Sequence, residues 1–280
     1  MRRLLIVGNW KMHLNASQAS LLVHRLQERI KIRRNIEVVL APSMLVLQPL
    51  SLQIDRRKFR LASQNAYFHD EGAFTGEVSF TMLRELVHYG IVGHSERRHV
   101  FSEDLPMIRD KVAAAIRNEI TPILCIGETK HERDEGETKQ VLHDQLMTAL
   151  SNLTAHEAGS IVIAYEPVWA IGHVAAKPSL IQTAVDYVRG YVRDVFNEKA
   201  AKNLRVLYGG DVAPEVVQGI LSVPGVDGFL VGRSSLNYET FAGIVESAHR
   251  WQRGVPDGTP QRQAPGGTWP RDNEAGKEGE

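Results

Sequence analysis

The strongest constraint on the fold of this chain is a unit that recurs eight times: a short apolar run, a loop and a helical stretch. The apolar runs are nearly continuous rather than alternating, which is typical of strands buried on both faces of a parallel sheet. They occupy residues 4–9, 36–42, 59–65, 89–94, 120–127, 160–167, 204–210 and 226–232.

Segments with the apolar spacing of amphipathic helices lie between these runs. They are residues 17–31, 104–118, 137–153, 179–199 and 238–251, and Ser17 is the predicted N-cap of the first. Alternating strands and helices predict βαβ units, and eight such units predict an α/β fold with a closed (β/α)8 barrel, a TIM barrel. An open, doubly wound sheet is the alternative, but no GxGxxG motif follows the first run.

Residues 1–251 are expected to form one barrel domain, since α/β barrels of roughly 250 residues commonly fold as a single unit. The composition changes at residue 252, because the segment 252–280 is dense in Gly, Pro and charged residues and almost lacks aliphatic side chains. Such a segment cannot bury enough apolar surface to offset the entropy cost of ordering it. We therefore predict a disordered tail at 252–280, with Trp269 as the one residue that could anchor it.

The charge balance is even, with 33 Lys and Arg residues against 33 Asp and Glu residues. This balance argues against nucleic acid or a membrane surface as a partner, because both favour proteins with a basic excess. The N-terminal apolar run is too short for a secretory signal, and no run approaches the roughly 18 residues of a membrane span. We therefore expect a cytoplasmic protein. Its single cysteine, Cys125, lies in an apolar run and is expected to be a buried structural thiol.

Polar residues follow several of the predicted strands at the point where each strand ends. The C-terminal ends of the strands and the loops after them build the active site in (β/α)8 barrels. An amine, an imidazole and a carboxylate thus meet at one barrel mouth, from Lys11, His94 and Glu166. Each has an ordinary explanation by itself, as a surface lysine, a loop histidine and a capping or salt-bridging carboxylate. A catalytic site is favoured, because all three residues stand at the C-terminal ends of predicted strands.

The motifs around these residues resemble the triosephosphate isomerase family, in that family's order and spacing. They are "GNWKM" (8–12), "IVGHSERR" (91–98), "IAYEPVWAIG" (163–172), "YGG" (208–210) and "GFLVG" (228–232). The resemblance extends from about residue 4 to about residue 250. It implies an enzyme of glycolysis and gluconeogenesis that interconverts dihydroxyacetone phosphate and D-glyceraldehyde 3-phosphate through an enediolate. It also implies that neither a metal nor an organic cofactor is needed.

The resemblance implies a role for each catalytic candidate. Glu166 matches the base that removes the proton next to the carbonyl, and His94 matches the neutral imidazole that donates to the carbonyl oxygen. Lys11 matches the cation that faces the developing oxyanion and the phosphate, and Asn9 adds a neutral donor. Glu96 matches a second carboxylate that pairs with Lys11 in the unliganded state or assists proton transfer.

Other motif residues match the lid and the phosphate-binding loops of the family. Pro167, Val168 and Trp169 (167–169) resemble the first hinge of a lid that excludes water from the reaction. Gly172 matches the lid residue whose N–H reaches the phosphate, and Tyr208 matches the tyrosine that latches the closed lid. Gly210 and Gly232 lie in the two strand-end loops that hold the phosphate. A Gly-Gly pair before a helix lets the backbone approach an anion.

Residues 65–79 resemble the loop by which one subunit of the family reaches into its neighbour. Its "FTGE" stretch is the strongest part of the match, and Thr75 is expected near Asn9 and Lys11 of the partner subunit. A homodimer is therefore implied. An ordinary surface loop is the alternative for this segment.

Departures from the family pattern cluster in the lid and the loops that are expected to bind the phosphate. The lid continues as "HVAAKP" (173–178), Asp211 replaces the usual Ser, Arg233 replaces a glycine, and His13 replaces Asn. In one hypothesis Arg233 offsets Asp211, through an ion pair or by contacting the phosphate. In the other hypothesis the phosphate site is impaired, and the protein acts on a different substrate or is a weak enzyme. The alternative functions are isomerisation of a related sugar phosphate, such as a tetrulose phosphate, and a non-catalytic barrel scaffold.

Overall fold

The computed structural model describes residues 3–172 and 175–255. Its strands form a closed barrel in which every neighbouring pair is parallel and the last strand pairs with the first. They are β1 (Leu4–Asn9), β2 (Ile36–Ala41), β3 (Phe59–Ser63), β4 (Tyr89–Val92), β5 (Thr121–Ile126), β6 (Val162–Tyr165), β7 (Arg205–Tyr208) and β8 (Gly228–Val231). The predicted (β/α)8 barrel is confirmed, and the pairing of β1 with β8 excludes the open sheet.

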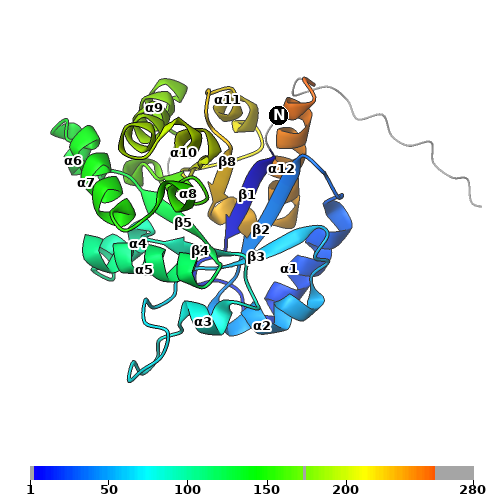
Figure 1. Cartoon of the computed structure of the whole chain (residues 1–280). Coiled ribbons are helices and arrows are strands. Elements are labelled where there is room, and N and C mark those ends of the chain that lie inside the picture. Colours follow the sequence, from blue (N-terminus) through cyan, green and yellow to red (C-terminus); the bar gives the residue numbers. More distant parts are fainter. Residues whose placement is uncertain (1–2, 173–174, 256–280) are drawn as a thin grey trace, which may run out of the picture.

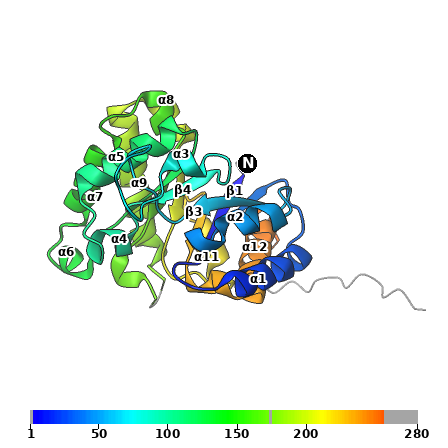
Figure 2. The same ribbon diagram turned by 90° about the horizontal axis from the view of Figure 1, so that it is seen from below.

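Helices and short 3-10 turns follow the strands and surround the barrel (Figures 1 and 2). They are α1 (Ala16–Arg29), α2 (Met44–Gln53), α3 (Phe80–Leu83), α4 (Ser95–His99), α5 (Leu105–Arg117), α6 (Lys130–Asp134), α7 (Thr138–Leu150), α8 (Ala155–Ala158), η1 (Val168–Ala170), α9 (Pro178–Val195), α10 (Glu198–Asn203), α11 (Val217–Leu221), η2 (Arg233–Leu236) and α12 (Tyr238–Gln252).

The core has two layers, because alternate strand residues point to opposite faces of the sheet. The inner layer contains side chains from all eight strands and none from a helix, so it fills the barrel interior. The outer layer packs the other strand face against the helices. Cys125 belongs to the inner layer, and burial raises the pKa of its thiol well above the usual value. It is a buried thiol, as predicted.

Two details of the helices differ from the sequence prediction. The N-cap of α1 is Asn15 rather than Ser17, because Asn15 and Gln18 exchange side-chain-to-backbone hydrogen bonds of 3.0 Å in a capping box. The segment 179–199 is not one helix, since α9 ends at Val195 and α10 begins at Glu198. Asn197 caps the second helix by accepting a hydrogen bond from the Ala200 N–H.

The last helix, α12, ends at Gln252, one residue beyond the predicted end of the barrel domain. Of the tail predicted at 252–280, residues 256–280 lie outside the described residues, as do His173 and Val174 of the lid. Across 3–172 and 175–255, no helix has the length and apolar character that crossing a membrane requires.

Candidate active site

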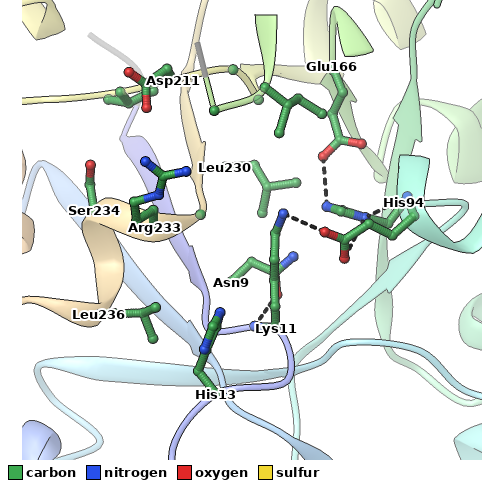
Figure 3. A pocket seen from close by; sticks show the side chains of 17 residues that line it. Asn9, Lys11, His13, His94, Glu166, Asp211, Leu230, Arg233, Ser234 and Leu236 are labelled. Carbon is green, nitrogen blue, oxygen red and sulfur yellow. Dashed lines mark hydrogen bonds and ion pairs between the residues drawn. The ribbon is translucent and has the colours of Figure 1, made fainter. Parts of the chain in front are cut away.

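A cavity of about 560 Å³ opens at the C-terminal ends of the strands (Figure 3). Because a parallel barrel gathers these ends at one mouth, residues far apart in the sequence share its walls. The predicted residues among them are Asn9, Lys11, His94, Glu96, Glu166, Gly172, Gly210, Asp211, Gly232 and Arg233, and His13 and Gly209 line it as well.

Lys11 is held in a conformation that non-glycine residues seldom adopt, with φ of 51°. The side chain of Asn9 accepts a hydrogen bond from the Lys11 N–H at 3.0 Å, and the Gln64 amide donates to the Lys11 carbonyl at 2.9 Å. The ammonium group of Lys11 pairs with Oε1 of Glu96 at 2.7 Å. The surrounding structure therefore imposes a strained backbone that aims this amine into the cavity.

Glu96 is half-exposed, and two effects on its carboxyl group oppose each other. Partial burial favours the neutral acid, but the hydrogen bond from Lys11 and the nearby charges outweigh it, so the pKa of Glu96 is lowered. The carboxylate is therefore ionised at neutral pH and offsets the charge of Lys11.

His94 is the N-cap of α4, and its orientation is set by the backbone of that helix. The Glu96 N–H donates to Nδ1 of His94 at 3.2 Å, so the neutral imidazole carries its proton on Nε2. This Nε2 lies 3.3 Å from Oε1 of Glu166, and both side chains are buried. The Ser95 N–H donates to Oε2 of the same carboxylate at 3.2 Å.

The residues predicted as a hinge, Pro167, Val168 and Trp169 (167–169), directly follow Glu166, and they are anchored by Glu128. The Val168 N–H donates to the Glu128 carbonyl at 3.0 Å, and the Trp169 indole N–H donates to the Glu128 carboxylate at 2.8 Å. The Arg133 guanidinium lies 3.9 Å from the centre of the Trp169 ring. The carboxylate of Glu128 is fully buried, so these contacts hold Val168 and Trp169 in place.

The two glycines after β7 are needed for packing, whatever their predicted role toward an anion. A Cβ on Gly209 would lie 2.8 Å from Cγ of Glu166, and one on Gly210 would lie 2.1 Å from the Tyr208 hydroxyl. That hydroxyl accepts a hydrogen bond from the Ala176 N–H, on the far side of the predicted lid, at 2.8 Å. Burial raises the pKa of Tyr208 to about 12.

Asp211 and Arg233 lie on the side of the cavity away from Glu166 and His94, as Figure 3 shows. Of the ion pairs within 4.0 Å in the described part of the chain, none joins Asp211 to Arg233. Nη2 of Arg233 instead lies 3.5 Å from the point that a Cβ on Gly172 would occupy, and Gly172 has φ of 75°. The guanidinium therefore lies against Gly172, in the predicted lid.

The segment 65–79 projects from the barrel as a long loop, drawn in cyan in Figure 1. Thr75 is exposed on it. The rings of His69 and Phe74 stack with their centres 4.8 Å apart, and Asp70 ties the loop to Arg117 at 3.0 Å. The loop is therefore an ordered feature with its own contacts.

Three residues that position the site were not among the predicted site residues. Gln64 stands directly after β3, at the level where the other candidates were sought, so its place in the chain was a usable signal. Ser95 donates its backbone N–H to the Glu166 carboxylate, and Glu128, in the loop after another strand, accepts a hydrogen bond from Trp169. Neither contact has a signature in the local sequence. Within 3–172 and 175–255, no group of three or more His, Cys, Asp or Glu side chains could hold a metal ion.

Comparison with known proteins identifies the family. The family model described as triosephosphate isomerase matches residues 4–248. A triosephosphate isomerase of Geotalea uraniireducens is 41% identical over 88% of this chain and 98% of its own length. Those of Chloroherpeton thalassium and Syntrophotalea carbinolica are 41% and 42% identical, over 89% and 88% of this chain and 100% and 98% of their own lengths. The chain belongs to the triosephosphate isomerase family.

Proposed function

We propose that the barrel-mouth cavity interconverts dihydroxyacetone phosphate and D-glyceraldehyde 3-phosphate, the aldose–ketose isomerisation of glycolysis and gluconeogenesis. The observation that carries this proposal is the 3.3 Å approach of a buried carboxylate, Glu166, to the Nε2 of a buried imidazole, His94. A carboxylate base and an N–H donor are the two groups that moving a proton next to a carbonyl requires. The family favours a triose phosphate over a tetrulose phosphate or a non-catalytic role.

The reaction needs only proton transfers in this arrangement. The Glu166 carboxylate takes a proton from the carbon next to the carbonyl, and the electron pair moves to the carbonyl oxygen to give the enediolate. Nε2–H of His94 and the Lys11 ammonium group stabilise the negative charge on that oxygen, and the Asn9 amide adds a donor. Nε2 of His94 then gives its proton to the former carbonyl oxygen and takes the proton of the neighbouring hydroxyl group, and the proton on Glu166 returns to the neighbouring carbon. No electron leaves the substrate, so the chemistry requires neither a metal nor an organic cofactor.

The lid and the base are coupled through the chain. Glu166 is directly followed by the hinge residue Pro167, so movement of the lid moves the carboxylate. In the described state, a hydrogen bond from the Ser95 N–H and the contact with His94 hold that carboxylate. We infer that lid closure releases it toward the substrate and excludes water, which would otherwise weaken the electrostatic stabilisation. Tyr208 latches the far side of the lid through Ala176.

We assign the phosphate group of the substrate to the end of the cavity away from Glu166 and His94, where Arg233 lies. Backbone N–H groups of Gly172, Gly210 and Gly232 are the proposed neutral donors, as in other barrels that hold phosphate in the loops after strands seven and eight. Arg233 adds a charged donor suited to a phosphate dianion. Asp211, which lines the same cavity, opposes that charge.

A homodimer and a cytoplasmic location are further parts of the proposal. Beside the active site, Met12 is 94% exposed and Phe101 is 60% exposed. Apolar side chains so exposed support a surface that a second copy covers, with Thr75 beside Asn9 and Lys11 of the partner subunit. Sedimentation of the wild-type chain and of a Thr75→Arg variant tests the dimer, and cell fractionation tests the location.

The function is tested by following the purified chain with each triose phosphate in a coupled assay. Turnover in both directions that inorganic phosphate inhibits competitively would support the proposal. A protein with the wild-type circular dichroism spectrum but no turnover of either triose phosphate would overturn it. A tetrulose phosphate in the same assay serves as the comparison substrate.

A further inference from the structure

Cationic side chains are concentrated at the end of the barrel opposite the active site. The segment 29–34 holds four Arg and Lys residues, the segment 56–60 holds four more, and neither contains an acid. Both segments lead into strands, β2 and β3, so they lie at the N-terminal ends of the barrel strands. We call these two segments, together with Arg3 before β1, the basic face.

Contacts between elements hold the segments of the basic face side by side. The Gln27 side chain, in the last turns of α1, accepts a hydrogen bond from the Asp55 N–H at 2.5 Å, and the Lys58 ammonium donates to the Gln27 carbonyl. The Leu4 N–H donates to the Asn35 carbonyl at 3.0 Å, which brings Arg3 beside the segment 29–34. The basic face is therefore one surface formed by three successive strand entries.

Three acids around this surface pair with arginines, and Glu28 contacts the His24 imidazole at 3.3 Å. Asp55 pairs with Arg57 at 3.0 Å, Glu246 with Arg33 at 2.9 Å, and Glu37 with Arg205 at 3.3 Å. Arg3, Lys31, Arg34 and Arg56, in contrast, are exposed and take part in none of the ion pairs found among the described residues. The formal net charge of the whole chain is zero, so an excess of acids elsewhere offsets the excess of cations on the basic face. Positive and negative charges are therefore unevenly distributed over the protein.

Two aliphatic side chains stand among these cations. Ile32, between Lys31 and Arg33, is 50% exposed, and Leu52, in the last turn of α2 before Arg56, is 83% exposed. A nucleic-acid backbone offers phosphates to the cations but nothing to exposed aliphatic groups. A bilayer that contains anionic lipids offers both, phosphate groups at its surface and an apolar layer just beneath.

We propose that the basic face docks the protein on bilayers rich in anionic phospholipid, with Ile32 and Leu52 entering the headgroup layer. The active site opens at the opposite end of the barrel, so docking leaves it accessible to substrate. This proposal revises the expectation that the neutral net charge excludes a membrane surface, because a net charge carries no information on where the charges lie.

The test is co-sedimentation with vesicles at low salt, using phosphatidylcholine alone or phosphatidylcholine mixed with phosphatidylglycerol. The wild-type chain should sediment only with the mixed vesicles, and added salt should release it. Arg34→Gln with Arg56→Gln should lower partitioning about 25-fold, since each cation near such a surface contributes about fivefold. Ile32→Ser should lower it without any change in charge.

The matched control is Lys130→Gln with Lys139→Gln, which removes two exposed lysines from α6 and α7 near the other end of the barrel. It should partition like the wild type, and all variants should retain wild-type isomerase turnover. Equal loss of partitioning in the control, or no sedimentation with mixed vesicles, would overturn the proposal. So would tight binding to a duplex DNA oligonucleotide that Ile32→Ser leaves unchanged while vesicle binding is absent.

Discussion

Nε2 of His94 lies 3.3 Å from Oε1 of Glu166, and the two side chains come from the ends of different strands. The contact joins the proposed proton donor to the proposed base before substrate arrives. Because the Glu96 N–H occupies Nδ1 of His94, the proton on the neutral imidazole faces the cavity. The backbone of α4 thus orients one of the two proposed catalytic groups, and the other directly precedes the proposed hinge after β6.

Glu166→Asp should lower kcat about 100-fold, because withdrawing the carboxylate by about 1 Å removes it from the position that proton transfer needs. KM should change little, since the proposed phosphate contacts lie at the other end of the cavity. Steady-state kinetics with glyceraldehyde 3-phosphate measures both. Glu215→Asp, at an exposed position, is the matched control and should behave as wild type. Full activity in Glu166→Asp would remove Glu166 from the role of base.

Arg233→Gly should raise KM for the triose phosphates more than Arg233→Gly combined with Asp211→Ser does. Loss of the guanidinium leaves the Asp211 carboxylate facing a phosphate dianion in the same cavity, and the second substitution removes that repulsion. The comparison of both single variants with the double variant measures the coupling. Equal impairment of the single Arg233 variant and the double variant would show that the two residues act independently.

Gly210→Ala should lower the Tm by about 3–10 °C, because overpacking of a buried site costs about 1–3 kcal/mol. The new methyl group would fall 2.1 Å from the Tyr208 hydroxyl and displace the ring that holds Ala176. Thermal unfolding followed by circular dichroism measures the change. Gly219→Ala is the control, since a Cβ there meets no atom within 4 Å. An unchanged Tm in Gly210→Ala would contradict the packing role.

Asp70→Asn should destabilise the protein at neutral pH, and the difference from wild type should shrink in acid. Hydrogen bonds from Arg117 and Asn118 hold the pKa of Asp70 at about 2, below its ordinary value of 3.8. A folded pKa below the unfolded one contributes stability above pH 3.8 that is lost as the pH falls toward 2. Urea midpoints of both proteins from pH 7 downward measure this.

Asp194→Asn is the control for that experiment, because it removes an exposed carboxylate on α9, away from the 65–79 loop. Its urea midpoint should stay close to that of the wild type. A difference between Asp70→Asn and wild type that stays constant down to pH 2 would show that the ionised carboxylate is not what stabilises the loop. Since Asp70 is half-exposed, the effect should also weaken as salt is added.

The element order and most of the catalytic candidates could be predicted because both rest on local patterns. Buried parallel strands produce continuous apolar runs, and a barrel places the loops after these runs at one mouth. Lys11, His94 and Glu166 were found by that rule, and Gln64 could have been. Asn15 was missed as a cap because several residues before a helix can serve, and only the backbone conformation selects one.

The sequence by itself therefore determined the barrel, the order of its elements and the family, since periodicity and motif spacing are properties of neighbours along the chain. Only the tertiary structure decided which residues meet across strands. Glu128 anchors Trp169, Tyr208 fills the space that Gly210 leaves, and the segments 29–34 and 56–60 combine into one basic face. Barrel closure creates these contacts between residues that are distant in the sequence, so neither the local spacing of residues nor the net charge of the chain can predict them.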